Sequence, residues 1–516
     1  MQRRWTLGVM AALLGTASLL PAAATADDPP FGRPAAGSLF LHPERIAFED
    51  GGWLEAERGV IYVPTRRTQS TSQTISVEVY RFPAAEGVAR DMPPIFVLHG
   101  GPGWPGLEGS LESSRYYDSR LRPLTELADV VVVGQRGIGS SKPNTACEAP
   151  PESEPDAEVT EAMRFAAMRQ ASEQCRAFWD AAGLDLKGFT VIEAAADVND
   201  IRQALGYEQI ILWGGSFGSH WSMAVMRYYP ETVARAVLTG LEGPDHTYDM
   251  PSETFAAIER MAEAAEASAE LAPHLPEEGL VEAFRGLIAR LEKEPLMLTV
   301  DHPETGEPRK VRFDASDVRG MARGYTGSAG SRRRLPRWPG ELLELLAGDF
   351  SQPARRALNE GSGFPTASFF MLDCGSGISQ ARLEKLLADP AVEVIGPLGW
   401  FYRASCPAWG SDLGEDFRQN FETDIPSALI HGNWDTSTPL ENAQELAPFF
   451  KRGKLVVVKG GTHGALREAL NEADGFRDQL AQFIRTGDLS GLPEEVQLPP
   501  IEWDIPAPES AEGGDE

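Results

Sequence analysis

Short apolar runs that alternate with helical stretches constrain the fold of this chain more than any other feature. The runs are Ile95–Leu98, Val130–Val133, Ile210–Trp213, Ala236–Thr239, Ala428–Ile430 and Leu455–Val458. Runs this short and this continuously apolar are typical of strands buried on both faces of a parallel sheet. Helical spacing fills two of the intervals between them, 191–205 and 217–229. The alternation therefore predicts an α/β fold.

The alternation stops between residues 243 and 424 and resumes at Ala428. Helical patterns dominate this block, and Leu296–Val300 is the main strand-like exception. We interpret the block as a mostly helical cap inserted into the α/β core. The predicted segments are a signal peptide (1–26), the first part of the core (27–242, beginning with a loose leader at 27–40), the cap (243–424), the second part of the core (425–487) and an acidic, Pro-containing tail that is loose or lies along the surface (488–516).

The amino terminus reads as a secretory signal. Arg3 and Arg4 precede the apolar run Trp5–Leu20, and the small residues Ala24-Thr25-Ala26 offer a cleavage site. A membrane anchor is the alternative, but the run is short for a span and stops at Pro21. No cysteine follows the cleavage site for a lipid anchor, and no later stretch is apolar and long enough to span. We expect a soluble mature protein, secreted or periplasmic, without membrane contact.

The formal charge of the chain is −29, from 47 basic and 76 acidic residues. Such a surface repels nucleic acid and anionic lipid, so we expect no nucleic-acid partner. It mildly favours cationic ligands, although solubility alone explains most of the charge. The sequence leaves the oligomeric state open.

The four cysteines, Cys147, Cys175, Cys374 and Cys406, contain no C-x-x-C pair, which argues against a zinc site. In an exported protein an even number suggests disulfides. Three pairings are possible, and the sequential one, Cys147–Cys175 with Cys374–Cys406, closes the shortest loops and is favoured. The alternative is four buried thiols.

The most specific motif is Gly214-Gly215-Ser216-Phe217-Gly218, between an apolar run and a helical stretch. A sharp strand-to-helix turn needs glycines where side chains would clash, and it lifts the serine hydroxyl clear of the sheet. The helix N-terminus beside it stabilises negative charge on an attacked carbonyl. We therefore expect Ser216 to be a nucleophile.

A serine nucleophile needs a base that is held by an acid, and α/β-hydrolases carry them in the order serine, acid, histidine. Of the eight histidines, only His463 lies beyond the strand that resumes at Ala428 and its loop, and it directly follows the run Leu455–Val458. Asp435 follows the preceding strand, on a loop at the same predicted sheet edge. The sequence predicts the triad Ser216, Asp435 and His463.

Two residues near Asp435, namely Asp424 and His431, suggest alternative assignments. Asp424 precedes its strand and would lie at the wrong end of the sheet, and Asp435 itself has an alternative role as a helix-capping residue. His431 lies four residues before Asp435, but a loop without a third ligand is a poor metal site. We expect no metal and no cofactor.

Acyl transfer also needs two backbone N–H donors for the oxyanion. Phe217, directly after the nucleophile, should supply one, and the loop His99–Gly103 should supply the other, through Gly101 or a neighbour. Pro102 has no N–H, and Trp104, next in the chain, is a candidate substrate contact. The run Gly134–Gly139 resembles a phosphate loop, but its spacing is wrong and no helix follows.

Together, His99–Gly103, Gln135–Ser141, Gly214–Ser219 and the segments around Asp435 and His463 resemble the proline iminopeptidase and secreted tripeptidyl aminopeptidase family. The resemblance spans roughly residues 50–240 and 425–485. It implies the α/β-hydrolase fold, a mostly parallel sheet flanked by helices, with a helical cap and no metal. It also implies removal of residues from peptide N-termini.

The resemblance is incomplete at two places. The family commonly has Asp before the Gln-Arg-Gly run, where this chain has Gly134. Family members place acids near the substrate's amino end, and Glu242, just beyond the run Ala236–Thr239, is a candidate by position, with a surface loop acid as the alternative.

These observations favour a serine aminopeptidase that acts on peptides with a free N-terminus through an acyl-enzyme. A carboxylesterase or lactonase with the same triad is the nearest alternative, and a catalytically inactive binding protein on the same fold is a further one. The preferred N-terminal residue and the number of residues released stay open.

Overall fold

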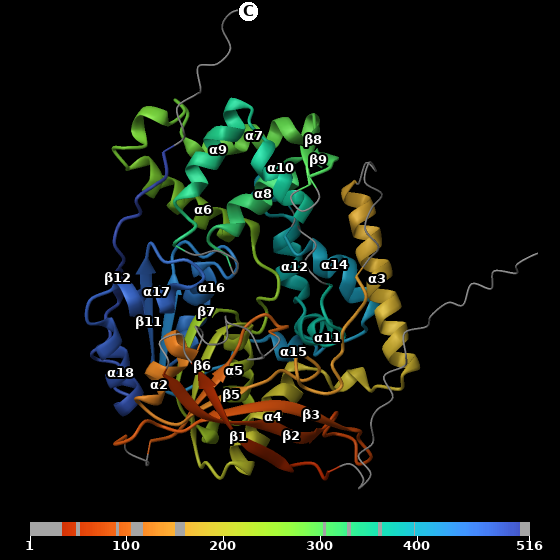
Figure 1. The fold of residues 1–516 in the computed structure, drawn as a ribbon, viewed down its shortest axis with the longest axis vertical. Helices are drawn as coiled ribbons and strands as arrows, with labels where there is room; N and C mark the ends of the chain where they lie inside the picture. The colour runs from red at the N-terminus through yellow and green to blue at the C-terminus, as the bar shows by residue number, and fades with distance from the viewer. Residues whose placement is uncertain are drawn as a thin grey trace, which may run out of the picture.

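The computed structural model describes residues 34–47, 52–88, 92–104, 117–149, 160–302, 306–327, 332–359, 364–396 and 398–505 (Figure 1). The predicted signal at 1–26 lies outside these residues. Within the described part of the chain, no helix combines the length and apolarity needed to span a bilayer.

A ten-stranded sheet forms the core, in the order β1-β2-β3-β5-β4-β6-β7-β10-β11-β12. The neighbours from β1 to β5 pair antiparallel, and those from β5 to β12 pair parallel. The mostly parallel sheet of the expected α/β-hydrolase fold is therefore confirmed. The strands are β1 (Leu39–Ala47), β2 (Trp53–Pro64), β3 (Thr74–Phe82), β4 (Ile95–Leu98), β5 (Val130–Val133), β6 (Ile210–Ser216), β7 (Val233–Leu241), β10 (Ser427–Gly432), β11 (Gly453–Lys459) and β12 (Glu495–Gln497).

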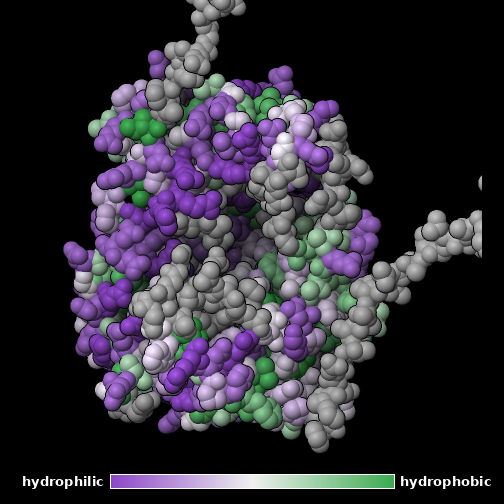
Figure 2. All heavy atoms as spheres, viewed as in Figure 1, coloured by the Kyte–Doolittle hydropathy of each residue, from purple (hydrophilic) through white to green (hydrophobic). Residues whose placement is uncertain are grey.

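Helices cover both faces of the sheet. One face packs mainly on α4 and α5 and the other on α2, α17 and α18, with a buried apolar cluster beneath each set. The β-branched runs of the central strands are fully buried, as their composition requires. The described α-helices outside the region between β7 and β10 are α2 (Arg122–Thr125), α3 (Glu161–Ala181), α4 (Val191–Ala204), α5 (Phe217–Tyr228), α16 (Leu440–Leu446), α17 (Ala465–Glu472) and α18 (Phe476–Thr486). On the face drawn in Figure 2, hydrophilic residues predominate on the side of α17 and α18.

Strands β7 and β10 are neighbours in the sheet, yet a long, mostly helical region separates them in the chain. It has an apolar core of its own and lies against the end of the sheet at which β10 and β11 finish (Figure 1). Backbone bonds join the two, as where the N–H of His463 donates to Thr326 O at 2.9 Å. The region contains α6 (Pro251–Glu266), α7 (Leu280–Lys293), β8 (Leu296–Asp301), β9 (Pro308–Phe313), α8 (Ala315–Gly324), α9 (Arg337–Ala347), α10 (Ser351–Asn359), α11 (Ala367–Ser376), α12 (Gln380–Leu387), α13 (Val392–Ile395), α14 (Trp400–Ser405) and α15 (Glu415–Arg418).

The leader differs from its sequence expectation, and the described part of the tail follows one of its two expected alternatives. The leader expected to be loose ends in β1, which pairs with β2 along its whole length. In the tail, β12 pairs with β11, and Leu492, Leu498 and Trp503 are buried, so residues 488–505 pack against the rest of the protein.

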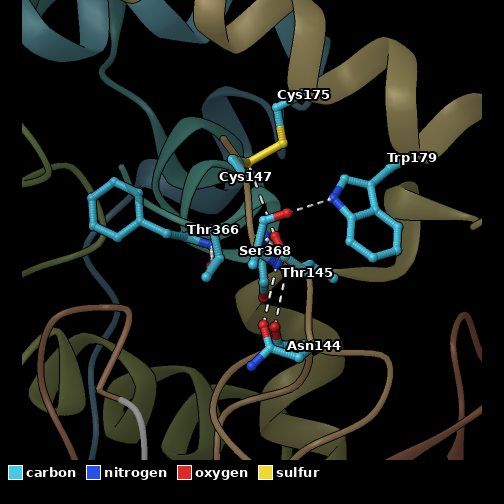
Figure 3. Close-up of a disulfide and its surroundings, with 10 residues drawn as sticks. Asn144, Thr145, Cys147, Cys175, Trp179, Thr366 and Ser368 are labelled. Carbon is cyan, nitrogen blue, oxygen red and sulfur yellow. Dashed lines mark hydrogen bonds between the residues drawn. A yellow bond between two sulfur atoms is a disulfide. The ribbon is translucent and has the colours of Figure 1, made fainter. Parts of the chain in front are cut away.

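The disulfides Cys147–Cys175 and Cys374–Cys406 are present, which confirms the sequential pairing. The first ties α3 to the segment after β5 (Figure 3). Close by, Trp179 Nε1 donates to Ala146 O at 3.2 Å, and the Ser368 N–H of α11 donates to Thr145 Oγ1 at 2.9 Å. The bridge thus lies where α3, the loop after β5 and α11 meet.

Candidate active site

Ser216 ends β6 and precedes α5 in a strained conformation, with φ of 57° and ψ of −133°. Among the described residues other than glycine, it alone has φ in the left-handed range. The flanking glycines leave no room for side chains: a Cβ on Gly218 would lie 2.0 Å from Leu98 O, and one on Gly214 would lie 2.3 Å from Ser222 Oγ. This is the geometry of a nucleophile elbow, in which tight packing sustains the backbone strain.

Asp435 and His463 form a close pair beside this turn, with Asp435 Oδ2 2.8 Å from His463 Nδ1. Asp435 is fully buried, and its other oxygen accepts the N–H groups of Ser437 at 2.9 Å and Thr438 at 3.0 Å. The Thr438 hydroxyl donates to Asp435 Oδ2 at 2.7 Å. These bonds fix the carboxylate so that it can orient the imidazole.

Asp435 and His463 shift each other's pKa values. Burial alone would raise the pKa of Asp435, but the charge and hydrogen bond of His463 outweigh it and the net shift is downward. Burial alone would lower the pKa of His463, but the charge and hydrogen bond of Asp435 raise it above its ordinary value. The pair therefore favours an ionised Asp435 that stabilises a protonated His463, as proton transfer from serine requires.

Ser216 and His463 line one cavity of about 700 Å³, together with Gly100, Gly101 and Trp104. A Cβ on Gly240 would lie 3.0 Å from His463 Cε1, so a glycine at the end of β7 leaves room for the ring. The structure thus brings the three residues of the expected triad to one edge of the sheet.

Asp424 lies away from Asp435, and His431 has a different role beside it. Asp424 is exposed and precedes β10, so it is at the opposite end of that strand from Asp435. His431 is buried, accepts the N–H of Leu241 on Nδ1 at 3.1 Å and lies 2.6 Å from Thr438 O through Nε2. These bonds assign the proton to Nε2, and burial lowers its pKa, so a neutral His431 braces the loop of Asp435.

The loop after β4 contacts the nucleophile and is held by the buried side chain of Gln135. Gln135 Nε2 donates to His99 O and to Gly100 O, both at 3.0 Å, and its Oε1 accepts the Gly103 N–H at 2.7 Å. A Cβ on Gly100 would lie only 2.9 Å from Ser216 Cβ. Since the Gly103 N–H is engaged, the expected donors Gly101 and Phe217 stay the candidates. No sequence pattern indicated this role for Gln135.

Trp104 follows this loop and stacks on His99, with ring centroids 3.6 Å apart. It lines the same cavity as Ser216.

Glu242 lies beside the elbow on the loop after β7. The Ser219 hydroxyl donates to Ser216 O at 2.7 Å and accepts the Glu242 N–H at 2.9 Å, so one side chain links the two residues. Glu242 is buried, which raises the pKa of its carboxyl well above the ordinary range, and the nearby Asp373 and Asp249 raise it further.

Asp249 and Asp373, which were not predicted from the sequence, complete an acidic cluster with Glu242. Burial raises the pKa of Asp373 to about 8, although the Tyr402 hydroxyl donates to its Oδ2 at 2.7 Å. Burial, and then the charge of Asp435, raise the pKa of Asp249. Within the described residues, Asp249 Oδ1 and Asp373 Oδ1 are buried without a hydrogen-bond partner. Asp249 lies in the chain after β7, as Glu242 does, so the same argument from position could have indicated it. Asp373 lies in α11 and belongs to no motif.

Comparisons with known proteins agree with this architecture. A family model described as alpha/beta hydrolase fold matches residues 93–274, and one described as TAP-like protein matches residues 395–494. Proline iminopeptidase of Neisseria meningitidis is 24% identical over 164 residues, which are 32% of this chain and 37% of the relative. The match therefore spans little more than a third of the length of the curated relatives.

The chain is also similar, at low sequence identity, to solved structures. A proline iminopeptidase-related protein from Thermus thermophilus is 18% identical, with 84% of this chain and 98% of that chain covered and a TM-score of 0.33. An esterase from Exiguobacterium antarcticum is 14% identical, with 80% and 96% covered and a TM-score of 0.34.

Proposed function

Because the chain is an α/β-hydrolase similar to proline iminopeptidases and TAP-like proteins, we propose that it is a serine aminopeptidase that cleaves peptides from a free N-terminus. Ser216 acts as nucleophile, His463 as general base and Asp435 as the acid that holds His463. The observation that carries the proposal is the 2.8 Å contact between Asp435 and His463, with His463 lining the same cavity as the strained Ser216.

The reaction proceeds in two steps. His463 takes the hydroxyl proton of Ser216 as the oxygen attacks the peptide carbonyl, and it then gives that proton to the leaving nitrogen. Water hydrolyses the acyl-enzyme with His463 again as the base. The N–H groups of Gly101 and Phe217 stabilise the oxyanion, and losing such a donor costs about 3–4 kcal/mol in the transition state.

Recognition of the free amine rests on Glu242, Asp249 and Asp373. Burial raises the pKa of each of these carboxyl groups, and Asp373 and Asp249 raise that of Glu242 further, so an ammonium beside Glu242 supplies the missing opposite charge. A substrate with a blocked amine brings no such charge. The cluster therefore supports an exopeptidase rather than an esterase for uncharged substrates.

The setting of the enzyme is part of the proposal. In this proposal residues 243–424 act as a cap over the triad, and because they carry Asp249 and Asp373 the cap contributes to substrate choice. The amino-terminal signal pattern and the two disulfides support export, with peptides outside the cytoplasm as substrates.

Three substitutions test the proposal with aminoacyl-p-nitroanilides as free amines and as N-acetylated forms. Ser216→Ala should abolish turnover and labelling by a fluorophosphonate while the protein stays folded. Glu242→Gln should lower kcat/KM for free-amine substrates by about 10- to 100-fold, the value of a charge-assisted hydrogen bond. Glu270→Gln, a change at an exposed glutamate outside the cluster, should leave both values unaltered.

Each alternative predicts a different result. Preference for acetylated substrates or simple esters would indicate a carboxylesterase or lactonase. Folded protein that the fluorophosphonate does not label would indicate a catalytically inactive binding protein, and activity that survives Ser216→Ala would refute the triad.

A further inference from the structure

The cavity that contains Ser216 and His463 extends away from the acidic cluster. From the loop His99–Trp104 it passes α2 and reaches α17 and α18, which lie together on one side of the sheet (Figure 1). None of Glu242, Asp249 and Asp373 is among the described residues that line it. Glu242 is linked to Ser216 through Ser219, so we take the acids as one side of the site and this cavity as the second side.

The second side has an apolar floor and a basic rim. Its apolar lining includes Trp213, Leu121, Leu124, Leu466, Leu470, Leu480 and Ile484. Four arginines line it against two acids, Glu126 and Asp478, although the whole chain has 76 acidic and 47 basic residues. The arginines are Arg120, Arg467, Arg477 and Arg485.

Arg467 on α17 and Arg485 on α18 are the most available of these cations. Both are exposed, and among the described residues no carboxylate lies within 4.0 Å of either guanidinium. Arg477 also lines the cavity but donates to Leu470 O at 3.0 Å. Two cations above an apolar floor suit a ligand that has an apolar body and an anionic end.

The chemistry fixes which part of a substrate enters this side. His463 must protonate the leaving nitrogen, so the leaving portion lies beside its ring. Gly464, Leu466 and Arg467 follow His463 in the chain and line the cavity with it. The acyl portion, which carries the free amine, then faces Glu242. The leaving portion runs toward α17 and α18.

We propose that this cavity binds the C-terminal portion of a short peptide, with its carboxylate held by Arg467 and Arg485 and its side chains on the leucine floor. This inference rests on the proposed function, because it takes a peptide as substrate. A cavity of about 700 Å³ holds a ligand of drug size, which corresponds to a few residues. The enzyme therefore prefers short free peptides over chain ends of large proteins.

A pair of matched peptides tests the carboxylate directly: one tetrapeptide as the free acid and as the C-terminal amide. Exposed guanidinium–carboxylate pairs are individually weak, so we expect KM for the acid to be about fivefold lower than for the amide. In Arg467→Gln combined with Arg485→Gln this difference should disappear. Arg452→Gln, which removes an exposed arginine just before β11 at the opposite end of the sheet, should keep it. Equal KM values for acid and amide in the unaltered protein, or an equal rise for both in the double variant, would overturn the proposal.

A second measurement separates this proposal from the aminopeptidase assignment. Hydrolysis of p-nitrophenyl acetate needs only the triad, and short peptides should inhibit it competitively, the free acids about fivefold better than the amides. Stronger inhibition by acids without any peptide cleavage would refute the aminopeptidase and keep the carboxylate site. Peptide cleavage with no preference for acids in either assay would do the reverse.

Discussion

The side chain of Gln135 makes three hydrogen bonds to the loop His99–Gly103, and replacing it with methionine tests what these bonds contribute. Methionine has a similar length and fills the same space, but it removes both donors and the acceptor. Gln135 is 2% exposed, so bulk water does not readily replace the lost bonds. The loop must either leave three polar groups unsatisfied or rearrange.

Each outcome has a magnitude. An unsatisfied buried donor or acceptor costs about 1–3 kcal/mol, so three such groups in an unchanged loop would lower the free energy of unfolding by at least about 3 kcal/mol. A loop that relaxes instead moves the Gly101 N–H away from the oxyanion, and losing one such donor lowers kcat by about 100- to 1,000-fold. Since the cavity beside the loop leaves space to relax, we expect the second outcome to dominate. Gln135→Met should then lose about 100-fold in kcat with KM within about threefold.

The assay is kcat and KM on an aminoacyl-p-nitroanilide, with urea unfolding of the same preparation. Gln209→Met is the control, because Gln209 is exposed and donates a single bond to Glu231 O at 3.1 Å. The fluorophosphonate labelling rate of Ser216 should fall together with kcat, since its transition state carries charge on the same donors. A folded Gln135→Met protein with kcat close to the unaltered value would refute the positioning role.

Three further predictions concern the two partners of Ser216 and one cross-link. His463 works as a base only when neutral and its pKa is raised, so kcat/KM should fall on the acid side through a pKa above 6.5; a limb below 6.5 would contradict this. Asp435→Asn should lower kcat by about 10,000-fold, and a loss under tenfold would exclude Asp435 as the acid. Replacing Cys374 and Cys406 with serine opens a loop with a sequence separation of 32 and should lower the free energy of unfolding by about 3–4 kcal/mol in urea titrations; an unchanged value would show that the cross-link does not stabilise the fold.

The parts of the site that follow strands were predictable from the sequence, because the fold fixes their surroundings locally. A buried strand, a glycine turn and a helix determine how Ser216 is presented, whatever the rest of the chain does. Asp435 and His463 each follow an apolar run, and the ends of neighbouring parallel strands meet at one edge. The cysteine pairing was predictable in the same way, since short loops close readily.

Other features depend on distant packing and leave no local pattern. Asp373 reaches Glu242 only because α11 packs against the core, and a helix with an interior aspartate looks ordinary in the sequence. Strand β1 contains Pro43 and several polar residues, as an edge strand does, so it lacks a buried strand's apolar run. Strand β12 is three residues long and buries only Val496, too little to stand out from an acidic tail.

The acidic cluster and the two arginines act together on the orientation of the substrate. Burial of Glu242, Asp249 and Asp373 favours their neutral forms, so this end of the site gains most from a ligand that brings a positive charge. Arg467 and Arg485 are exposed at the other end, where solvent screens them, so they add less to affinity and more to orientation. A peptide that enters backwards would bury its carboxylate beside these acids, which offer it no opposite charge, and burying an uncompensated charge is costly. The different chemistry of the two ends therefore selects both the free amine and the direction of the chain across Ser216.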